Sequence, residues 1–296
     1  MKAVVVEKPG DESVLKISDA PDPVCGEDDL LIRVKCAALN RADIMQRQGF
    51  YPPPPGASEI LGMECAGEVI ALGKCVTGWG VGDRAMALLP GGGYAEKAVA
   101  NYGSAMKVPP GLSDEEAAAL PEVFLTAFLN LFSLAQVQRG ENVLIHGGGS
   151  GVGTASLQLL REAGARAIVT AGSDEKCQQC LMFGADVAIN YRKGPFAPLV
   201  KAATNDRGAD VILDSIGGAY LAENLDALAP GGRLVLIGLM KGATAEINLA
   251  TVLRRQLKIF GSTLRGRPVA EKAQIVRDFL ARFGAVLEAG KLRPPV

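Results

Sequence analysis

The chain has 296 residues, of which 48% are hydrophobic and 21% are charged. At about 150 residues per domain, this composition predicts a globular protein of two domains. Thirty-one lysines and arginines face 32 aspartates and glutamates, which leaves a formal net charge of −1. Nucleic-acid-binding domains usually carry a basic excess, and disordered chains combine low hydrophobicity with high net charge, so both classes are disfavoured.

The chain contains no run of about 18 apolar residues, the length that a membrane-spanning helix requires. The apolar run near the N-terminus, Ala3–Val6, is too short for the core of a signal peptide. These two features predict a cytoplasmic protein. A disulfide framework is not expected, because the cysteines are scattered along a mid-sized chain: Cys25, Cys36, Cys65, Cys75, Cys177 and Cys180.

The first 120 residues consist of short apolar runs separated by glycine and proline, a pattern typical of an irregular β-rich domain. The proline run that follows Tyr51 is predicted to be a surface loop, because successive prolines fix φ and remove backbone donors. The predicted strands are Ala3–Val6, Leu30–Val34, Ala66–Leu72, Arg84–Leu89 and Met106–Val108.

From about Glu122 onward, apolar runs alternate with segments of helical periodicity, which predicts a doubly wound parallel sheet. The predicted helices are Val152–Ala163, Asp174–Phe183 and a long stretch at Val269–Ala289. The predicted strands are Asn142–His146, Arg166–Ala171, Asp186–Tyr191, Asp210–Asp214, Arg233–Gly238 and Phe260–Leu264.

A glycine-rich loop separates the strand Asn142–His146 from the helix after it. A bound diphosphate requires backbone N–H groups close to its oxygens, and the N-terminus of a helix adds positive potential. Gly148, Ser150 and Gly153 occupy the three positions of the G-x-G-x-x-G pattern, with Gly151 beside the substituted one. The alternative is a close strand–helix crossing, but the strand–loop–helix context favours a dinucleotide site. No Lys-Ser or Lys-Thr pair ends the loop, which disfavours a triphosphate site.

The end of the next strand bears on the choice between NAD and NADP. An NAD site has an acidic residue about 20 residues beyond the loop, where it accepts from the ribose 2′-hydroxyl. Here that position is Gly172, and Ser173 and Lys176 follow with a hydroxyl and a cation. This spacing favours NADP, although Asp174 and Glu175 lie nearby. The alternative is that Ser173 only caps the following helix and Lys176 is solvated.

Across nearly its whole length the sequence resembles the zinc-free medium-chain dehydrogenases/reductases of the quinone oxidoreductase (zeta-crystallin-like) branch, and most closely the tumour-suppressor-inducible quinone oxidoreductase subgroup. The matching segments lie in both halves of the chain: Leu39–Gly49, Pro53–Ser58, Ala85–Gly93, Pro121-Glu122, Leu125–Phe128, Ser150–Thr154, Thr170–Ser173, Asn190-Tyr191 and Gly238–Met240.

The resemblance implies an α/β fold with a GroES-like substrate domain over residues 1–120 and a Rossmann NADP-binding domain over 121–262. Residues 263–296 would return to the substrate domain, incompletely, because relatives continue about 30 to 35 residues further. It also implies NADPH in the interdomain cleft, with Asn40 and Tyr51 at the catalytic, nicotinamide end. The implied cofactor contacts are Asn40, Tyr51, Thr126, Gly148, Ser150, Gly151, Val152, Gly153, Gly172, Ser173, Lys176, Tyr191, Gly238, Leu239, Met240 and Leu264.

Metal chemistry is not expected. Zinc-dependent relatives bind the metal through Cys, His and Glu side chains, but Asn40 stands where the ligand Cys falls and Met63 where the ligand His falls. Cys177 and Cys180 have metal-like spacing without a second Cys/His pair, and we expect them to be helix-face or buried thiols. The single histidine, His146, is expected in the core, so acid–base chemistry based on histidine is disfavoured.

The resemblance therefore implies reduction of a quinone by NADPH, one electron at a time, to a semiquinone. Tyr51 either donates a proton to the acceptor or only contacts the cofactor. Two alternatives stay open: an enone or enal reductase on the same scaffold, and an NADPH-binding protein with weak activity because of the short C-terminus. By family analogy, pairing of an exposed edge strand at Arg233–Gly238 would give a homodimer.

Overall fold

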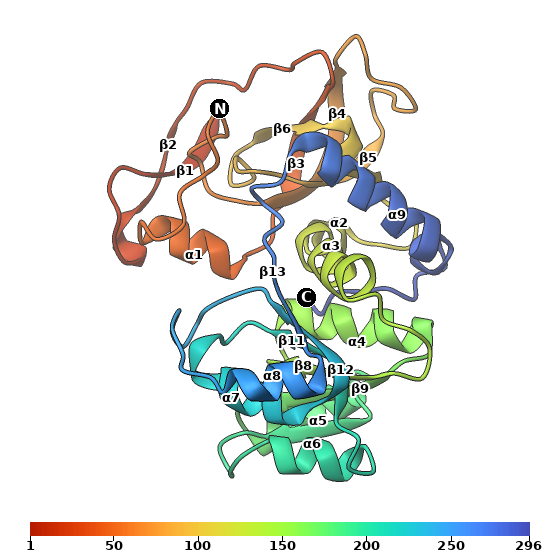
Figure 1. Cartoon of the computed structure of the whole chain (residues 1–296). Coiled ribbons are helices and arrows are strands. Elements are labelled where there is room, and N and C mark those ends of the chain that lie inside the picture. The colour runs from red at the N-terminus through yellow and green to blue at the C-terminus, as the bar shows by residue number, and fades with distance from the viewer. The chain divides into compact units, whose positions relative to one another are not determined.

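The computed structural model describes residues Met1 to Val296, and the chain divides into two compact units (Figure 1). The first unit comprises Met1–Leu125 together with Leu264–Val296. The second comprises Thr126–Thr263. The second unit is therefore an uninterrupted stretch of chain inserted into the first.

The first unit is built on a five-stranded antiparallel sheet with the strand order β6-β3-β4-β5-β7, accompanied by the antiparallel pair β1-β2. Short strands separated by glycine- and proline-rich turns produce this architecture, as the sequence predicts. The strands are β1 (Lys2–Val6), β2 (Leu15–Asp19), β3 (Asp29–Cys36), β4 (Glu64–Leu72), β5 (Arg84–Leu88), β6 (Lys97–Asn101) and β7 (Ala105–Lys107).

The core of the first unit follows the two-residue period of its strands. On β3, Leu30 and Ile32 are fully buried while Arg33 is exposed, because neighbouring side chains point to opposite faces of a sheet. Val69 of β4 packs into the same cluster.

The helices of the first unit come from distant parts of the chain. The longest, α9, begins after the return from the second unit (Figure 1). It packs against η2. Its buried positions, among them Val276, Phe279 and Phe283, recur at helical spacing. The helical segments are η1 (Glu12–Val14), α1 (Arg41–Arg47), η2 (Tyr102–Ser104), α2 (Asp114–Ala118), α3 (Pro121–Phe128, which crosses into the second unit) and α9 (Val269–Glu288).

The second unit is a six-stranded parallel sheet with the order β10-β9-β8-β11-β12-β13. Its strands are β8 (Asn142–His146), β9 (Arg166–Ala171), β10 (Val187–Asn190), β11 (Ala209–Asp214), β12 (Leu228–Leu236) and β13 (Lys258–Gly261). Its helical segments are the π-helical η3 (Leu129–Leu134), α4 (Gly151–Ala163), α5 (Asp174–Met182), α6 (Ala197–Ala203), α7 (Gly218–Ala227) and α8 (Leu249–Arg255).

The strand order reverses between β8 and β11, because the chain adds β9 and β10 on one side of β8 and the later strands on the other. In open parallel sheets, ligands bind beyond the carboxyl ends of the strands at such a switch point. The prediction of a β-rich domain followed by a doubly wound parallel sheet is confirmed by these two sheets.

Two predicted strands need correction. The segment Arg233–Gly238 is not at a sheet edge, because β12 pairs with β11 on one side and β13 on the other. The last strand is Lys258–Gly261, not Phe260–Leu264. The strand ends at Gly261 because Gly261 pairs with Leu236, the last residue of its partner β12. Residues after Gly261 therefore have no strand residue to pair with.

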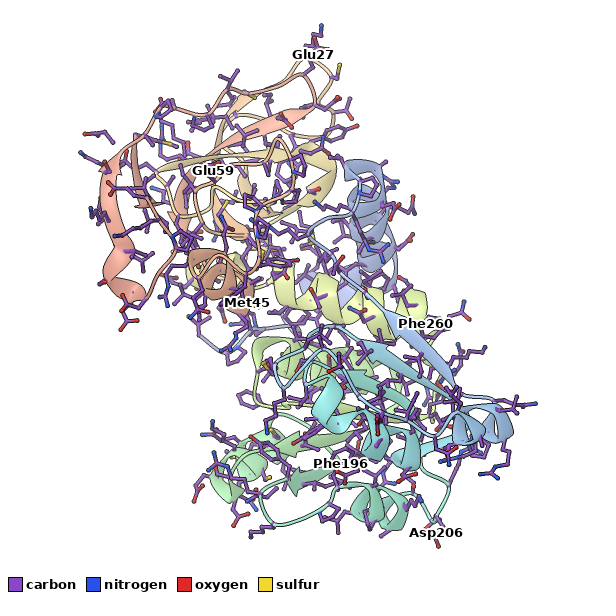
Figure 2. All side chains as sticks on the ribbon, turned by 60° about the vertical axis from the view of Figure 1, so that its left-hand side comes forward. Glu27, Met45, Glu59, Phe196, Asp206 and Phe260 are labelled. Carbon is purple, nitrogen blue, oxygen red and sulfur yellow. The ribbon has the colours of Figure 1, made fainter.

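The core of the second unit contains the single histidine. His146 is buried, with its ring edge-on to Phe196 and Tyr220, and Figure 2 labels Phe196 within this unit. The Nδ1 atom of His146 lies 3.0 Å from Thr170 Oγ1, and its Nε2 atom lies 2.6 Å from Asn224 Oδ1. Burial lowers the pKa of His146 to about 4, so the ring is neutral at pH 7. The core assignment of this residue is confirmed.

None of the helices combines the length and the apolar character that crossing a bilayer requires.

Candidate functional site

The glycine loop of the second unit joins β8 to the N-terminus of α4. Gly147, at φ 74°, turns the chain, and Ser150 caps the helix, its Oγ accepting from Gly153 N at 3.1 Å. The N–H groups of Gly151 and Val152 lie in the first turn of α4, where the backbone donors have no carbonyl acceptor within the helix. They and the positive end of the helix dipole are suited to bind an anion.

Two glycines of this loop are required by close backbone approach. A Cβ on Gly153 would lie 2.5 Å from Gly147 O and 2.6 Å from Gly148 O. A Cβ on Gly148 would lie 2.6 Å from the side chain of Val169. Gly149, by contrast, has no atom within 4 Å of its Cβ position. The loop therefore has the tight packing and the open side that a dinucleotide diphosphate needs.

The carboxyl end of β9 carries Gly172, and a Cβ there would lie 2.7 Å from the hydroxyl oxygen of Tyr191. The structure thus brings together two predicted residues that are far apart in sequence. Ser173 caps α5, its Oγ accepting from Lys176 N at 3.2 Å, so the capping interpretation of Ser173 holds geometrically. The side chain of Lys176 is exposed and makes no ion pair with Asp174 or Glu175.

The acidic residue nearest to this strand end is engaged elsewhere. Asp174 accepts from Asn190 Nδ2 at 2.9 Å and forms an ion pair with Lys193 at 2.6 Å. Those contacts, first Asn190 and then Lys193, hold the pKa of Asp174 below its usual range. The carboxylate that weakens the case for NADP is therefore partly neutralised by Lys193.

Two residues beside this strand end escape prediction from the sequence. The ring of Tyr220 lies edge-on to that of Tyr191, and the ammonium of Lys241 lies over both rings, at 5.4 Å from Tyr191 and 5.6 Å from Tyr220. Lys241 N donates to Ile216 O at 2.8 Å, so the loop after β12 packs on the loop after β11. No sequence spacing relates Tyr220 to Lys241, which explains why neither was found.

The remaining predicted cofactor residues fall in both units. Gly238 packs against Ser215, while Leu239 and Met240 are half exposed, at 55% and 50%. Thr126, in α3, accepts through its backbone carbonyl from Asn130 Nδ2 at 2.7 Å. Leu264 is buried in the first unit.

In the first unit, Asn40 belongs to a buried polar cluster. Asn40 Nδ2 donates to Glu64 Oε1 at 2.7 Å, and the backbone N of Glu122 donates to Glu64 Oε2 at 2.8 Å. Burial raises the pKa of Glu64 to about 8, against the two hydrogen bonds. The sequence drew attention to Glu64 only through its place beside Met63.

A second carboxylate orders the same region. Asp43 accepts from Asn40 N at 2.9 Å, from Gly62 N at 3.0 Å and from the hydroxyl of Tyr94 at 2.8 Å. These three hydrogen bonds, from three segments of the chain, fix the start of α1 and with it the position of Asn40. Burial, and then the charge of Asp43, raise the pKa of Tyr94, which keeps its proton.

Tyr51, the other predicted catalytic residue, lies beside a buried arginine. The guanidinium of Arg265 is 5.3 Å from the Tyr51 ring centroid and donates to Tyr51 O at 3.4 Å. It also donates to Pro90 O and to Gln46 Oε1, both at 2.7 Å. Burial raises the pKa of Tyr51, so its hydroxyl is a donor at neutral pH. Arg265 was missed, although it directly follows the predicted Leu264.

The cysteine and methionine positions offer no metal site. No three Cys, His, Asp or Glu side chains gather in the arrangement that holds a metal ion. Met63 is buried, and Cys177 and Cys180 are buried thiols on α5, as expected from the sequence.

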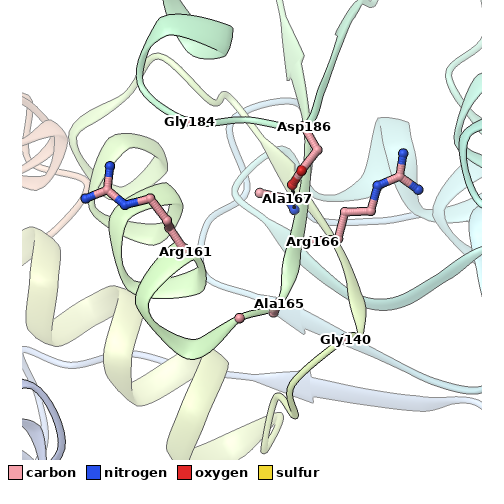
Figure 3. A pocket seen from close by; sticks show the side chains of 8 residues that line it. Gly140, Arg161, Ala165, Arg166, Ala167, Gly184 and Asp186 are labelled. Atoms are coloured by element: carbon pink, nitrogen blue, oxygen red, sulfur yellow. Dashed lines mark hydrogen bonds between the residues drawn. The ribbon is translucent and has the colours of Figure 1, made fainter.

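A shallow pocket of the second unit lies away from these residues (Figure 3). Its lining includes Arg161, Arg166 and Asp186. Arg166 begins β9, whereas the glycine loop follows the end of β8. The pocket therefore lies at the amino ends of the parallel strands and the glycine loop at their carboxyl ends. We assign it no role in cofactor binding.

Comparison with known proteins identifies the relatives of this chain. Residues 26–110 match the family model of the alcohol dehydrogenase GroES-like domain, and residues 151–282 match that of the zinc-binding dehydrogenases. The quinone oxidoreductase of Lama guanicoe is 33% identical over 298 residues, which cover 100% of this chain and 88% of that protein.

Solved structures agree. The quinone oxidoreductase of Escherichia coli complexed with NADPH has a TM-score of 0.86 at 27% identity, covering 100% of this chain and 90% of that one. The CurK enoyl reductase has a TM-score of 0.87 at 28% identity, with coverage of 100% and 90%. The chain therefore belongs to the medium-chain dehydrogenase/reductase family and is an oxidoreductase of the quinone oxidoreductase type.

Proposed function

We propose that this protein reduces a quinone, or another electron-poor acceptor, with NADPH as the electron donor. The bound dihydronicotinamide would supply the reducing electrons, and the protein would supply binding, orientation and a dry environment. The observation that carries the cofactor assignment is the end of β9, where Gly172 replaces an acidic residue and the Tyr191 hydroxyl lies beside it.

The second unit would bind the adenosine and diphosphate parts of the cofactor. The N–H groups of Gly151 and Val152 would bind the diphosphate at the start of α4. Lys176 and Tyr191 would bind the 2′-phosphate by charge and by a hydroxyl donor. The other residues assigned to the cofactor are Thr126, Gly148, Ser150, Gly153, Gly172, Ser173, Gly238, Leu239 and Met240, with Asn40, Tyr51 and Leu264 in the first unit.

The first unit would orient the nicotinamide end and the acceptor. Tyr51 keeps its proton, because burial and then the charge of Glu122 raise its pKa, and Arg265 only partly offsets them. Its hydroxyl would donate a hydrogen bond to the oxygen of the acceptor. Alcohol oxidation needs a group that stabilises an alkoxide, such as a bound metal, and the side chains of this cluster do not form a metal ligand set. An acceptor that is already electron-poor therefore suits the cluster best.

The fate of the electrons separates two candidate functions. One-electron delivery would give a quinone radical, whereas hydride delivery to a conjugated double bond would make the protein an enone or enal reductase. The second candidate is supported by the similarity to CurK enoyl reductase. Electron paramagnetic resonance during NADPH consumption distinguishes them, since a two-electron product with no radical would exclude the first.

The cofactor assignment is tested by Lys176→Ala. A hydrogen bond to a charged group contributes about 1.5–3 kcal/mol, so NADPH affinity should fall about tenfold to a hundredfold while NADH affinity stays the same. Lys258→Ala, which removes an exposed lysine at the start of β13, is the control. Fluorescence titration measures both cofactors. If wild type binds NADH as tightly as NADPH, or Lys176→Ala weakens both equally, the assignment is wrong.

A homodimer stays a prediction. The outer strand that is available for pairing on this side of the sheet is β13, not β12, and light scattering with multi-angle detection would measure the oligomeric state.

A further inference from the structure

The carboxyl group of Glu64 is fully buried and accepts one hydrogen bond on each oxygen. One donor is the backbone N–H of Glu122 at the start of α3, which can only donate a hydrogen bond and never accept one. The other donor is the carboxamide of Asn40, which offers an N–H group on one side and an oxygen on the other. The two hydrogen bonds are therefore different in kind: one is fixed and one is reversible.

A proton on Glu64 would change only the reversible bond. An ionised carboxylate accepts on both oxygens, which matches the observed contact with Asn40 Nδ2. A neutral carboxyl group has one donating O–H. That O–H cannot face Glu122 N, because two donors would then meet. It must face Asn40, which then has to present Oδ1 to Glu64 in order to accept.

We propose that the protonation of Glu64 decides which end of the Asn40 carboxamide is turned away from it: the acceptor Oδ1 when Glu64 is ionised, and the donor Nδ2 when Glu64 is neutral. Glu64 is in this sense a positioning residue, which acts on its surroundings through Asn40.

The surroundings place this change near neutral to mildly alkaline pH. Burial raises the pKa of Glu64 to about 8, and the carboxylates of Glu122 and Asp43 act in the same direction. The thiol of Cys65 and the hydroxyl of Tyr94 also interact with Glu64, and both keep their protons because burial raises their pKa values.

The nearby cations act on the neighbouring carboxylates. Arg265 interacts with Asp43 and Glu122, and Lys272 interacts with Glu122. Neither is among the groups that shift the pKa of Glu64. The carboxyl group of Glu64 consequently takes up its proton at a higher pH than an exposed glutamate.

This inference extends the proposed function at one point. If Asn40 faces the nicotinamide end of the cofactor, the protein would offer that end an acceptor at high pH and a donor at low pH. Cofactor affinity would then depend on pH through a residue that need not contact the cofactor.

The experiment uses the full chain, labelled with 13C at the side-chain carbonyl carbons of asparagine and glutamate. Asn40→Ser and Glu64→Gln identify the Asn40 Cγ and Glu64 Cδ resonances, and spectra are recorded from pH 6 to pH 10. Glu68→Gln is the matched control, because Glu68 lies on the same strand but its partner is the surface residue Arg33. NADPH affinity is measured at the two ends of the pH range for the same proteins.

We expect Glu64 Cδ and Asn40 Cγ to shift with one common midpoint in the wild type and in Glu68→Gln. The Asn40 shift should vanish in Glu64→Gln, whose amide imitates the neutral carboxyl group at every pH. If Glu64 is already fully ionised at pH 6, or if the Asn40 resonance does not shift with that of Glu64 in the wild type, the proposal is overturned.

The cofactor measurement tests a separate statement. A pH-dependent NADPH affinity that disappears in Glu64→Gln supports the placement of Asn40 at the cofactor. The Glu64 and Asn40 resonances could shift together while NADPH affinity depends on pH in the same way in wild type and in Glu64→Gln. That result would overturn the placement of Asn40 at the cofactor and leave the Glu64–Asn40 coupling intact.

Discussion

The hydroxyl oxygen of Tyr191 lies 2.7 Å from the point that a Cβ of residue 172 would take, so Tyr191 and the missing side chain of Gly172 share one space. The absence of a side chain at Gly172 thus does two things. It removes the carboxylate that would repel a 2′-phosphate, and it makes room for a hydroxyl donor from the next strand end.

Gly172→Asp should therefore reverse the cofactor preference. The new carboxylate would repel the 2′-phosphate and accept from the 2′-hydroxyl of NADH, so NADPH affinity should fall at least about tenfold while NADH affinity is kept or gained. Isothermal titration calorimetry measures both. Gly172→Ala is the control, because it displaces Tyr191 without adding charge; an equal effect of the two substitutions would point to steric crowding alone.

Gly153→Ala should disrupt the glycine loop, because its Cβ would lie 2.5 Å from Gly147 O, a backbone atom that cannot rotate away. Gly149→Ala provides the comparison within the same loop, since nothing lies within 4 Å of its Cβ position. We expect the first variant to lose NADPH binding, and to melt at a lower temperature, while the second retains its fold. Equal melting temperatures for the two variants would contradict the close packing described here.

Arg265→Ala should destabilise the first unit. It removes the hydrogen bonds from the guanidinium to Pro90 O and Gln46 Oε1, and a hydrogen bond to a charged group contributes about 1.5–3 kcal/mol. Arg33→Ala, which breaks the exposed ion pair with Glu68, should cost no more than about 1 kcal/mol. Urea unfolding compares the two. A smaller loss for Arg265→Ala than for Arg33→Ala would show that the hydrogen bonds from Arg265 to Pro90 and Gln46 do not stabilise the first unit.

The stability of the protein should depend on pH through Glu64. The usual pKa of this carboxyl group is 4.5, and in the folded protein it is raised to about 8. Between these values the folded state keeps a proton that the unfolded state releases, so the contribution of Glu64 to stability falls as pH rises, by up to about 1.4 kcal/mol per pH unit.

Glu64→Gln has no proton to release at this position and should lose stability less steeply over that range. Urea unfolding at pH 5, 6, 7 and 8 measures the slope, with Glu68→Gln as the reference. Parallel curves for Glu64→Gln and wild type would mean that Glu64 is ionised in the folded protein throughout.

The glycine loop and the strand ends could be predicted from the sequence because their signals are local. The strand Asn142–His146, the loop and the helix after it are contiguous, and Gly172 follows at a spacing that the fold fixes. The resemblance to a known family supplied the rest of that assignment, including Tyr191.

The polar cluster of the first unit has no local signal. Asn40, Glu64 and Glu122 come from three separate elements, and only antiparallel pairing and the position of α3 bring them together. The error at Arg233–Gly238 has a similar origin. Whether a strand lies at an edge depends on a partner, here Lys258–Gly261, whose existence cannot be read from the strand itself.

The insertion of Thr126–Thr263 into the first unit has a consequence for the order of folding during synthesis. The inserted stretch is complete, with all six of its strands, before the last part of the first unit leaves the ribosome. Arg265 and the long helix α9 both belong to that last part. Until the whole Rossmann sheet has been synthesised, the β-sheet of the first unit therefore lacks α9, and Tyr51 lacks its contact with Arg265.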